Sequence, residues 1–236
     1  MVSERRLVLA TRNGHKVGEL REILADVLRT TGLELVGLDA FAGLEDVVES
    51  GVTFAENALL KARYAAASTG LPALADDSGL AVDVLGGAPG VFSARWAGPL
   101  AQATGVAKDE ANNRLLLAQL ADVPDEYRGA GFVCAAALVV PGRGGVEGEA
   151  GRAAGSGGAG GGVGGGVAAT EVVREGTCRG VLAREPRGAN GFGYDPLLVR
   201  PDGRTLAEHT AGEKNAISHR GAAFRELAGD IERLLG

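Results

Sequence analysis

A glycine-rich tract near the middle of the chain limits where a packed core can form. Glycine makes up 39 of the 236 residues, and residues 142–166 read GRGGVEGEAGRAAGSGGAGGGVGGG. Such a run buries too little apolar surface to offset the entropy lost on ordering, so we expect a flexible loop. The G-x-G-x-x-G match at residues 160–165 is not interpreted as a dinucleotide fingerprint, because no strand or helix pattern flanks it.

The tract separates two stretches that have the pattern of strands. Residues 131–140 form a continuous apolar run, which is typical of a buried strand. Residues 170–183 contain alternating polar and apolar side chains and are expected to pair with that run. The tract would then be the enlarged tip of a hairpin, since a long loop adds little to the cost of closure. With no second core and no internal repeat, we expect one domain, 1–236, with a flexible insertion at about 142–169.

The rest of the chain alternates between strand and helix patterns. Strands are expected at 7–10, 33–36 and 73–84, the last broken at Asp77-Ser78-Gly79, and helices at 16–28, 54–68, 109–120 and 213–235. Thr53 and Glu56 have the spacing of a capping box before the second helix, and Gly229 is a candidate interruption of the last one. This alternation predicts an α/β fold around a mixed sheet.

Composition excludes several classes of protein. Lysine and arginine number 24 and aspartate and glutamate 30, so the net charge of −6 argues against a nucleic acid polymer as the main partner. No apolar run approaches the roughly 18 residues of a membrane span, and the apolar stretch at 7–10 is too short for a signal peptide. Two cysteines form no disulfide framework, which favours the cytoplasm.

Two polar segments follow strand patterns in the first half of the chain. Residues 10–16 join a strand to a helix, where backbone N–H groups and Lys16 can bind an anion; the alternative is an ordinary helix start. Asp76 and Asp77 follow an apolar approach and, as neighbours on an extended chain, are expected to point to opposite faces. Their carboxylates can hold Mg²⁺, which prefers oxygen ligands; the alternative is a polar turn.

Two further segments lie in the second half. Residues 186–196 place three glycines around Phe192 and Tyr194, and such a loop can grip a flat ligand or simply plug the core with its aromatic rings. Residues 213–221 place Lys214, Ser218 and either His219 or Arg220 about one turn apart on a helix, which on its own describes a solvated helix face. Together, the four segments supply what a nucleotide with a metal-bound polyphosphate requires.

Five stretches in this order resemble the inosine triphosphate pyrophosphatase family, the noncanonical purine nucleoside triphosphate pyrophosphatases, and in particular its bacterial dITP/XTP pyrophosphatase type. They are LATRNGHKVGELREIL, ESGVTFAENALLKARYAA, ALADDSGLAVDVLGGAPGVFSARWAG, EPRGANGFGYDPLLV and LAEHTAGEKNAISHRGAAF. The likeness spans nearly the whole chain except the glycine-rich tract, which is not part of the family pattern. The combination of ADDSGL, GFGYDP and ISHRG is highly specific.

The resemblance implies an elongated, two-lobed α/β fold around a long twisted mixed sheet with a central cleft, and a homodimer. It implies Mg²⁺-dependent hydrolysis of ITP, dITP and XTP to the monophosphate and pyrophosphate, which removes deaminated purines from the nucleotide pool. The family's metal ligand and proton acceptor falls on Asp77, its second metal ligand on Glu49 and a phosphate-binding lysine on Lys61. The other implied substrate contacts are Thr11, Arg12, Asn13, Gly14, His15, Lys16, Ser78, Phe192, Gly193, Tyr194, Asp195, Lys214, His219 and Arg220.

Several alternatives remain open from the sequence. Asp77 either accepts the proton of the attacking water or only holds the metal that acidifies it. Lys214 or Arg220 can donate to the 6-oxo group of hypoxanthine and xanthine, but nothing in the sequence explains how guanine is rejected. Arg12 stands where glycine is common in relatives. Competing functions are a Maf-type house-cleaning pyrophosphatase, a nucleotide-binding regulator without catalytic activity and a structural protein.

Overall fold

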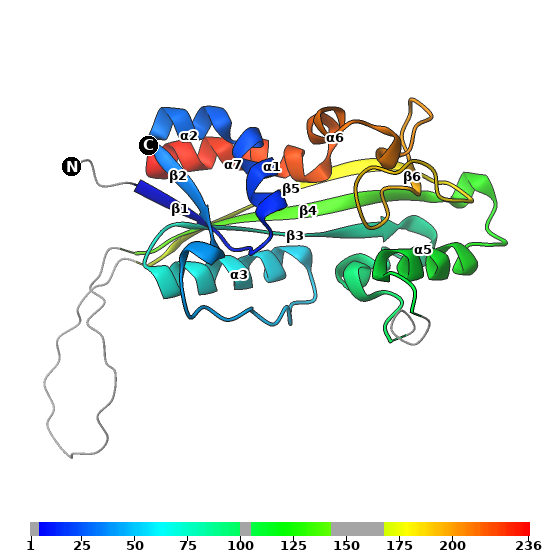
Figure 1. Cartoon of the computed structure of the whole chain (residues 1–236), viewed down its shortest axis with the longest axis horizontal. Coiled ribbons are helices and arrows are strands. Elements are labelled where there is room, and N and C mark those ends of the chain that lie inside the picture. The colour runs from blue at the N-terminus through cyan, green and yellow to red at the C-terminus, as the bar shows by residue number, and fades with distance from the viewer. Residues whose placement is uncertain (1–4, 100–104, 143–167) are drawn as a thin grey trace, which may run out of the picture.

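The computed structural model of the chain describes residues 5–99, 105–142 and 168–236 and shows six strands in one sheet, with helices on both faces (Figure 1). The strand order is β2-β1-β3-β4-β5-β6. The strands are β1 (Arg5–Leu9), β2 (Leu33–Gly37), β3 (Ala73–Val82), β4 (Gly129–Val140), β5 (Thr170–Leu182) and β6 (Leu198–Val199). The helices are α1 (Gly14–Ile23), α2 (Ala25–Thr31), α3 (Phe54–Thr69), α5 (Lys108–Gln119), α6 (Ala211–Ile217) and α7 (His219–Leu235).

The sheet is mixed, as the sequence predicts. β1 runs parallel to β2 and β3, whereas β3–β4, β4–β5 and β5–β6 are antiparallel. The three long strands β3, β4 and β5 extend along the whole molecule, with β1 and β2 beside one half and β6 beside the other (Figure 1). The elongated α/β architecture is therefore confirmed, and the long strands are shared by both lobes.

Helices cover the two faces of the sheet differently. Figure 1 shows α1, α2, α6 and α7 above the sheet and α3 and α5 below it. The face of α3 that meets the sheet consists of small buried residues, including Ala58, Ala62 and Ala65, which pack against Ala75 and Ala135 of the strands. Small side chains on both sides allow close approach. The polar residues of α3 can therefore reach the strand that carries the two neighbouring acids.

The prediction that the third strand breaks at Asp77-Ser78-Gly79 is wrong. β3 continues through Asp77-Ser78-Gly79, which pair with Ala135, Cys134 and Val133 of β4. Asp-Ser-Gly favours turns locally, but the long antiparallel ladder with β4 satisfies the backbone hydrogen bonds and overrides that preference. Gly79 is needed for another reason: a Cβ there would lie 2.6 Å from the carbonyl oxygen of Gly90, because the 3₁₀ helix Gly90–Arg95 packs directly against the strand.

Two predicted helices are each divided in the structure. The helix expected at 16–28 is α1 and α2, which meet at Leu24. The helix expected at 213–235 is α6 and α7, and it divides at Ser218 rather than at Gly229. Ser218 has an extended backbone and its hydroxyl accepts the N–H of Gly221 at 2.9 Å, so it caps α7 and ends α6. The pattern of apolar residues continues through the break at Leu24 and hides it from periodicity, whereas the break at Ser218 depends on the cap.

The hairpin around the glycine-rich tract has its predicted strands. β4 and β5 pair from Gly129 with Val181 up to Val140 with Thr170. The tract itself, residues 143–167, lies outside the described residues, so the expected flexible insertion stays a prediction. None of the described helices has the length and apolar character needed to cross a membrane.

Candidate active site

The neighbouring acids in the middle of β3 point to opposite faces of the sheet, as the pleat predicts. On one face, Asp76 lies 3.2 Å from the Lys16 ammonium of α1 and 3.1 Å from Nε of Arg220 at the start of α7. On the other, Asp77 lies 3.4 Å from the Lys61 ammonium of α3. The strand thus places one carboxylate among the helices above the sheet and the other against α3.

A cavity of about 320 Å³ lies where β1, α3 and the segment 41–53 meet; we call it the cationic cavity. Its lining includes Thr11, Lys16, Lys61, Glu49 and Asp76. Two lysines and several carboxylates in one hollow suit a ligand that carries both phosphate groups and a bound cation.

Lys61 joins the two carboxylates that the sequence assigns to a metal. Its ammonium lies 2.6 Å from Oε1 of Glu49 and 3.4 Å from Oδ1 of Asp77. Burial alone would lower the pKa of Lys61, but Asp77 and Glu49 outweigh that effect and raise it. Burial raises the pKa of Asp77 above its usual range, and Lys61 only partly opposes that rise while Glu49 adds to it. Further positive charge between these acids would therefore be favourable.

The donor set fits Mg²⁺. Glu49 and Asp77 offer hard oxygen ligands, and Mg²⁺ is commonly held by one or two carboxylates plus substrate phosphate and water. Among the described residues no group of three or more histidine, cysteine, aspartate or glutamate side chains gathers around one point. Asn57 contacts one of these acids: its Nδ2 donates to Asp77 at 3.1 Å, while its Oδ1 accepts the N–H of Gly51, two residues after Glu49, at 2.8 Å.

A buried chain of ion pairs connects this region with α7. Arg220 binds Asp76 and also lies 3.2 Å from Glu19 of α1, and its side chain is 4% exposed. Burial would raise the pKa of Asp76, but Lys16 and Arg220 outweigh it and hold the carboxyl far below its usual range. Asp76 is therefore ionised and fixes one cation on each side of it.

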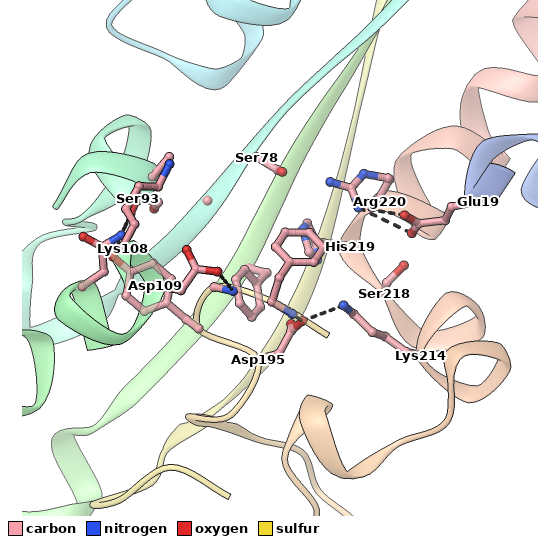
Figure 2. Close-up of a pocket in the computed structure, with 17 residues that line it drawn as sticks. Glu19, Ser78, Ser93, Lys108, Asp109, Asp195, Lys214, Ser218, His219 and Arg220 are labelled. Atoms are coloured by element: carbon pink, nitrogen blue, oxygen red, sulfur yellow. Dashed lines mark hydrogen bonds and ion pairs between the residues drawn. The ribbon is translucent and has the colours of Figure 1, made fainter. Parts of the chain in front are cut away.

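A second cavity, of about 230 Å³, lies beyond Arg220; we call it the aromatic cavity (Figure 2). Figure 2 shows Ser93, Lys108 and Asp109 on one side of it and Lys214, His219 and Arg220 on the other. Ser78 of β3 also lines this cavity, so β3 borders both hollows.

His219 forms a flat, uncharged part of this lining. Its ring stacks on Phe132, with centroids 4.9 Å apart and planes inclined by 13°. Burial, helped by the nearby Arg220 charge, lowers the pKa of His219 to about 3. Its Nδ1 is buried and has no hydrogen-bond partner among the described residues. A neutral, flat ring in the lining suits an aromatic ligand.

The neutral state of His219 makes stability depend on pH. The pKa of His219 in the folded protein is lower than its unfolded value of about 6.5. The contribution of the neutral, buried ring to stability is therefore full above pH 6.5 and is lost as the pH falls toward 3, because the unfolded chain binds the proton more tightly. We expect His219 to account for about 2 kcal/mol of the fall in unfolding free energy between pH 7 and pH 5. Urea denaturation of the wild type and His219→Phe, which keeps a flat ring on Phe132, measures this contribution. Equal losses in the two proteins would contradict it.

The segment Phe192 to Asp195 forms the outer wall of the aromatic cavity. Phe192 is 59% exposed, and the Lys214 ammonium lies 4.8 Å from its ring centroid. Asp195 is buried, accepts the N–H of Phe192 at 2.8 Å and binds Lys214 at 2.6 Å. Tyr194 is buried and its hydroxyl donates to the Ser93 carbonyl at 2.9 Å. Phe192 is thus free to meet a ligand, whereas Tyr194 does fill the core.

The structure brings most predicted site residues to the two cavities. Those lining the cationic cavity are Thr11, Arg12, Lys16, Glu49 and Lys61, with Asp77 in contact with Lys61; those lining the aromatic cavity are Ser78, Phe192, Gly193, Tyr194, Asp195, Lys214, His219 and Arg220. Asp77, Asn13 and Gly14 line neither cavity. The Asn13 Oδ1 accepts the backbone N–H of Lys16 at 3.4 Å, and Gly14 begins α1. The side chain of His15 lies outside the described part of the chain.

Arg12 makes contacts that the sequence does not predict. Its Nε donates to Asp46 at 3.1 Å, and its Nη2 donates to the carbonyl oxygen of Leu44. The guanidinium therefore ties the segment 41–53 to the start of α1 while it lines the cationic cavity. This geometry fits a residue that shapes the wall of the cavity.

Several residues at the site are missed by sequence reasoning. Glu19 and Asn57 lie three residues after Lys16 and four before Lys61, so helical spacing places them beside those lysines and is a usable signal. Asp76 is visible in the sequence, but only the structure shows its two cationic partners. Ser93 and Asp109 line the aromatic cavity without any sequence signal, because tertiary packing alone brings them there.

Comparison with known proteins adds to this geometry. A sequence model described as the Ham1 family matches residues 7–160 and 164–230. The dITP/XTP pyrophosphatase of Streptomyces avermitilis is 54% identical over 233 residues, which cover 98% of this chain and 99% of that protein. The dITP/XTP pyrophosphatase of Frankia alni is 55% identical over 232 residues, which cover 98% of both.

Solved structures agree with the sequence matches. The structure of a HAM1 protein from Coxiella burnetii has a TM-score of 0.75 and 37% identity, and the match covers 97% of this chain and 99% of that one. The crystal structure of a nucleoside-triphosphatase / dITP/XTP pyrophosphatase from Mycobacterium abscessus has a TM-score of 0.66 and 46% identity, with 94% and 98% covered. The matches to solved structures and to sequences therefore extend over nearly the whole chain.

Proposed function

Because this chain belongs to the Ham1 family, we propose that it hydrolyses the noncanonical purine nucleoside triphosphates ITP, dITP and XTP to the monophosphate and pyrophosphate. The chain is thus a nucleoside triphosphate pyrophosphatase, a hydrolase acting on a phosphoric anhydride. The observation that carries this conclusion is the pair of cavities along β3, one lined by both cations and carboxylates and one lined by aromatic rings, connected by the Lys16–Asp76–Arg220 ion pairs.

The aromatic cavity would hold the purine. The exposed ring of Phe192 offers a face for stacking, and Lys214 and Arg220 offer donors toward a 6-oxo group. Adenine carries a 6-amino donor at that position and would leave buried donors facing a donor, which is costly. A site built to hydrogen-bond one group discriminates strongly against a base that lacks it. The cavity therefore favours hypoxanthine and xanthine over adenine.

The cationic cavity would hold the triphosphate. Lys16 and Lys61 supply positive charge, and the backbone N–H groups at the start of α1 add donors for phosphate oxygens. Glu49 and Asp77 would hold Mg²⁺, which when bound neutralises phosphate charge and acidifies a coordinated water. Both carboxylates already contact Lys61, so the lysine is placed to move between acid and phosphate partners.

Asp77 is the residue that we assign to proton transfer. A water oxygen forms the new bond to the α-phosphorus, the α–β bridging bond breaks, and pyrophosphate leaves. Asp77 accepts the proton of that water through its carboxylate. Asn57 orients the carboxylate by donating to Oδ2, which leaves Oδ1 facing Lys61.

A turnover panel tests this function. With Mg²⁺, we expect kcat/KM for ITP, dITP and XTP to exceed that for ATP by about a hundredfold or more, with pyrophosphate as the phosphate product. Including dUTP and 5-methyl-UTP tests the Maf-type alternative, and omitting Mg²⁺ tests the metal requirement. Release of inorganic phosphate, equal rates with ATP, or a preference for the pyrimidines would each refute the proposal.

The remaining expectations belong to the same proposal. The protein is expected to act as a homodimer in the cytoplasm, where it would remove deaminated purines from the nucleotide pool, with neither a nucleic acid polymer nor a membrane as partner. Sedimentation equilibrium measures the assembly directly, with two chains of 23.9 kDa expected per particle.

A further inference from the structure

Helix α5 holds the backbone of the segment that carries Phe192. Asp109 Oδ2 accepts the N–H of Gly193 at 2.8 Å, and Asn113 Nδ2 donates to the carbonyl oxygen of the same glycine at 2.9 Å. Asp109 and Asn113 are four residues apart and therefore lie on one face of the helix. Figure 2 shows the Asp109 contact at the edge of the aromatic cavity. The backbone N–H and the carbonyl oxygen of Gly193 are thus both held by one face of α5.

Gly193, the residue that α5 holds, has a backbone conformation that affects its neighbour Phe192. Gly193 has φ +61°, in the left-handed region that only glycine occupies without cost. Glycine has many accessible conformations, so two hydrogen bonds to one rigid helix restrict it strongly. Since Gly193 directly follows Phe192, its backbone sets the direction in which the exposed ring points.

The helix itself is anchored independently. Asn112 accepts the N–H of Ala97 at 2.7 Å and donates to the carbonyl oxygen of Ser93 at 3.3 Å, and it is buried. These bonds tie α5 to the 3₁₀ helix Gly90–Arg95, whose Ser93 and Ala94 also line the aromatic cavity, and to the turn after that helix. α5 therefore connects the segment that carries Phe192 to the 3₁₀ helix.

Asn113 is poorly suited to a purely structural role. Its side chain is 7% exposed, and its Oδ1 is buried without a hydrogen-bond partner among the described residues. A buried acceptor without a donor is unfavourable, and an apolar side chain of similar shape would avoid that cost. The contact that justifies an amide at this position is the one to Gly193.

We propose that Asp109 and Asn113 are positioning residues that hold Gly193 so that Phe192 can stack on the purine. The inference rests on the proposed function, because it concerns the same site. It predicts that loss of either contact weakens binding of ligands that contain the base and leaves binding of the phosphate part unchanged.

The experiment measures the two products separately by calorimetry, together with steady-state kinetics on ITP. For Asn113→Leu, we expect the Kd of IMP and the KM of ITP to rise by about tenfold, with kcat and the Kd of pyrophosphate within about twofold of wild type. Thermal unfolding should change little, because the substitution removes a hydrogen bond and an unsatisfied acceptor together. Asp109→Leu should behave in the same way.

Two further variants separate positioning from general damage. Asp109→Asn keeps an oxygen that can accept the N–H of Gly193, so its IMP affinity should stay within about threefold of wild type. Arg114→Ala is the matched control, since Arg114 lies on the same helix, is exposed and contacts Glu110 rather than the segment that carries Phe192. It should leave both affinities unchanged.

The outcomes distinguish this inference from the proposed function. Unchanged IMP affinity in Asn113→Leu and Asp109→Leu, or equal losses for IMP and pyrophosphate, would overturn the positioning role while ITP turnover by the wild type stands. Absence of ITP turnover in the wild type would overturn the proposed function, and the ratio of IMP affinities would still decide whether α5 positions the segment. A wild type that binds no IMP would overturn both.

Discussion

Replacing Asp77 by asparagine is expected to lower kcat for ITP by about a thousandfold or more while nucleotide binding is retained. The amide has nearly the shape of the carboxylate, so Asn57 keeps a partner and the ladder between β3 and β4 is undisturbed. It has no negative charge to hold Mg²⁺ and is too weak a base to accept a proton. Pyrophosphate release with saturating Mg²⁺ gives kcat, and calorimetry with IMP checks binding.

The control for this variant is Asp83→Asn. Asp83 lies just beyond the end of β3, is exposed and pairs with Arg179, so its neutralisation removes one acidic charge far from the cavities. We expect this variant to keep wild-type turnover. A near-normal rate of ITP hydrolysis in Asp77→Asn would show that the role assigned to Asp77 is wrong.

Substituting Asp76 by alanine is expected to lower the free energy of unfolding by about 3–5 kcal/mol. Asp76 is 5% exposed and is the shared partner of Lys16 and Arg220, and the Arg220 side chain is itself 4% exposed. The substitution would leave a buried guanidinium with Glu19 as its remaining carboxylate partner in the described part of the chain. For a chain of this size, the change corresponds to a fall in Tm of about 6–20 °C.

Asp230→Ala provides the comparison for this second effect. Asp230 is also a buried aspartate with two arginine partners, but the side chains of Arg174 and Arg233 are 43% and 61% exposed. Solvent screens those ion pairs, so Asp230→Ala should lower the free energy of unfolding by about 1 kcal/mol or less. Thermal and urea unfolding of both variants test the contrast, and equal losses would mean that burial of Arg220 does not determine the cost.

The sequence predicts the parts of this molecule that depend on short-range rules. The pleat of an extended chain separates Asp76 from Asp77 without any knowledge of their partners. The capping box at Thr53 and Glu56 marks the start of α3, where the structure has it. The two strands that flank the glycine-rich tract pair as their apolar patterns indicate.

The features that the sequence does not predict depend on distant parts of the chain. β3 passes straight through an Asp-Ser-Gly stretch because β4 supplies a full ladder of partners, and no local pattern reveals that ladder. The break at Ser218 follows from a side-chain cap, which helical spacing over 213–235 does not reveal. Asp109 and Asn113 look like ordinary helical residues until Gly193, about eighty positions away, is placed beside them.

The unbroken course of β3 also sets how the chain can change in length. Inserting or deleting one residue between Ala73 and Asp76 would exchange the directions of the two acids, turning Asp77 toward α7 and Asp76 toward α3. The number of residues between the start of β3 and the two acids is therefore constrained, because each acid must face its own cationic partners. The stretch between Val140 and Thr170 is under no such constraint, because these two residues are already paired and a longer or shorter connection leaves every strand in register.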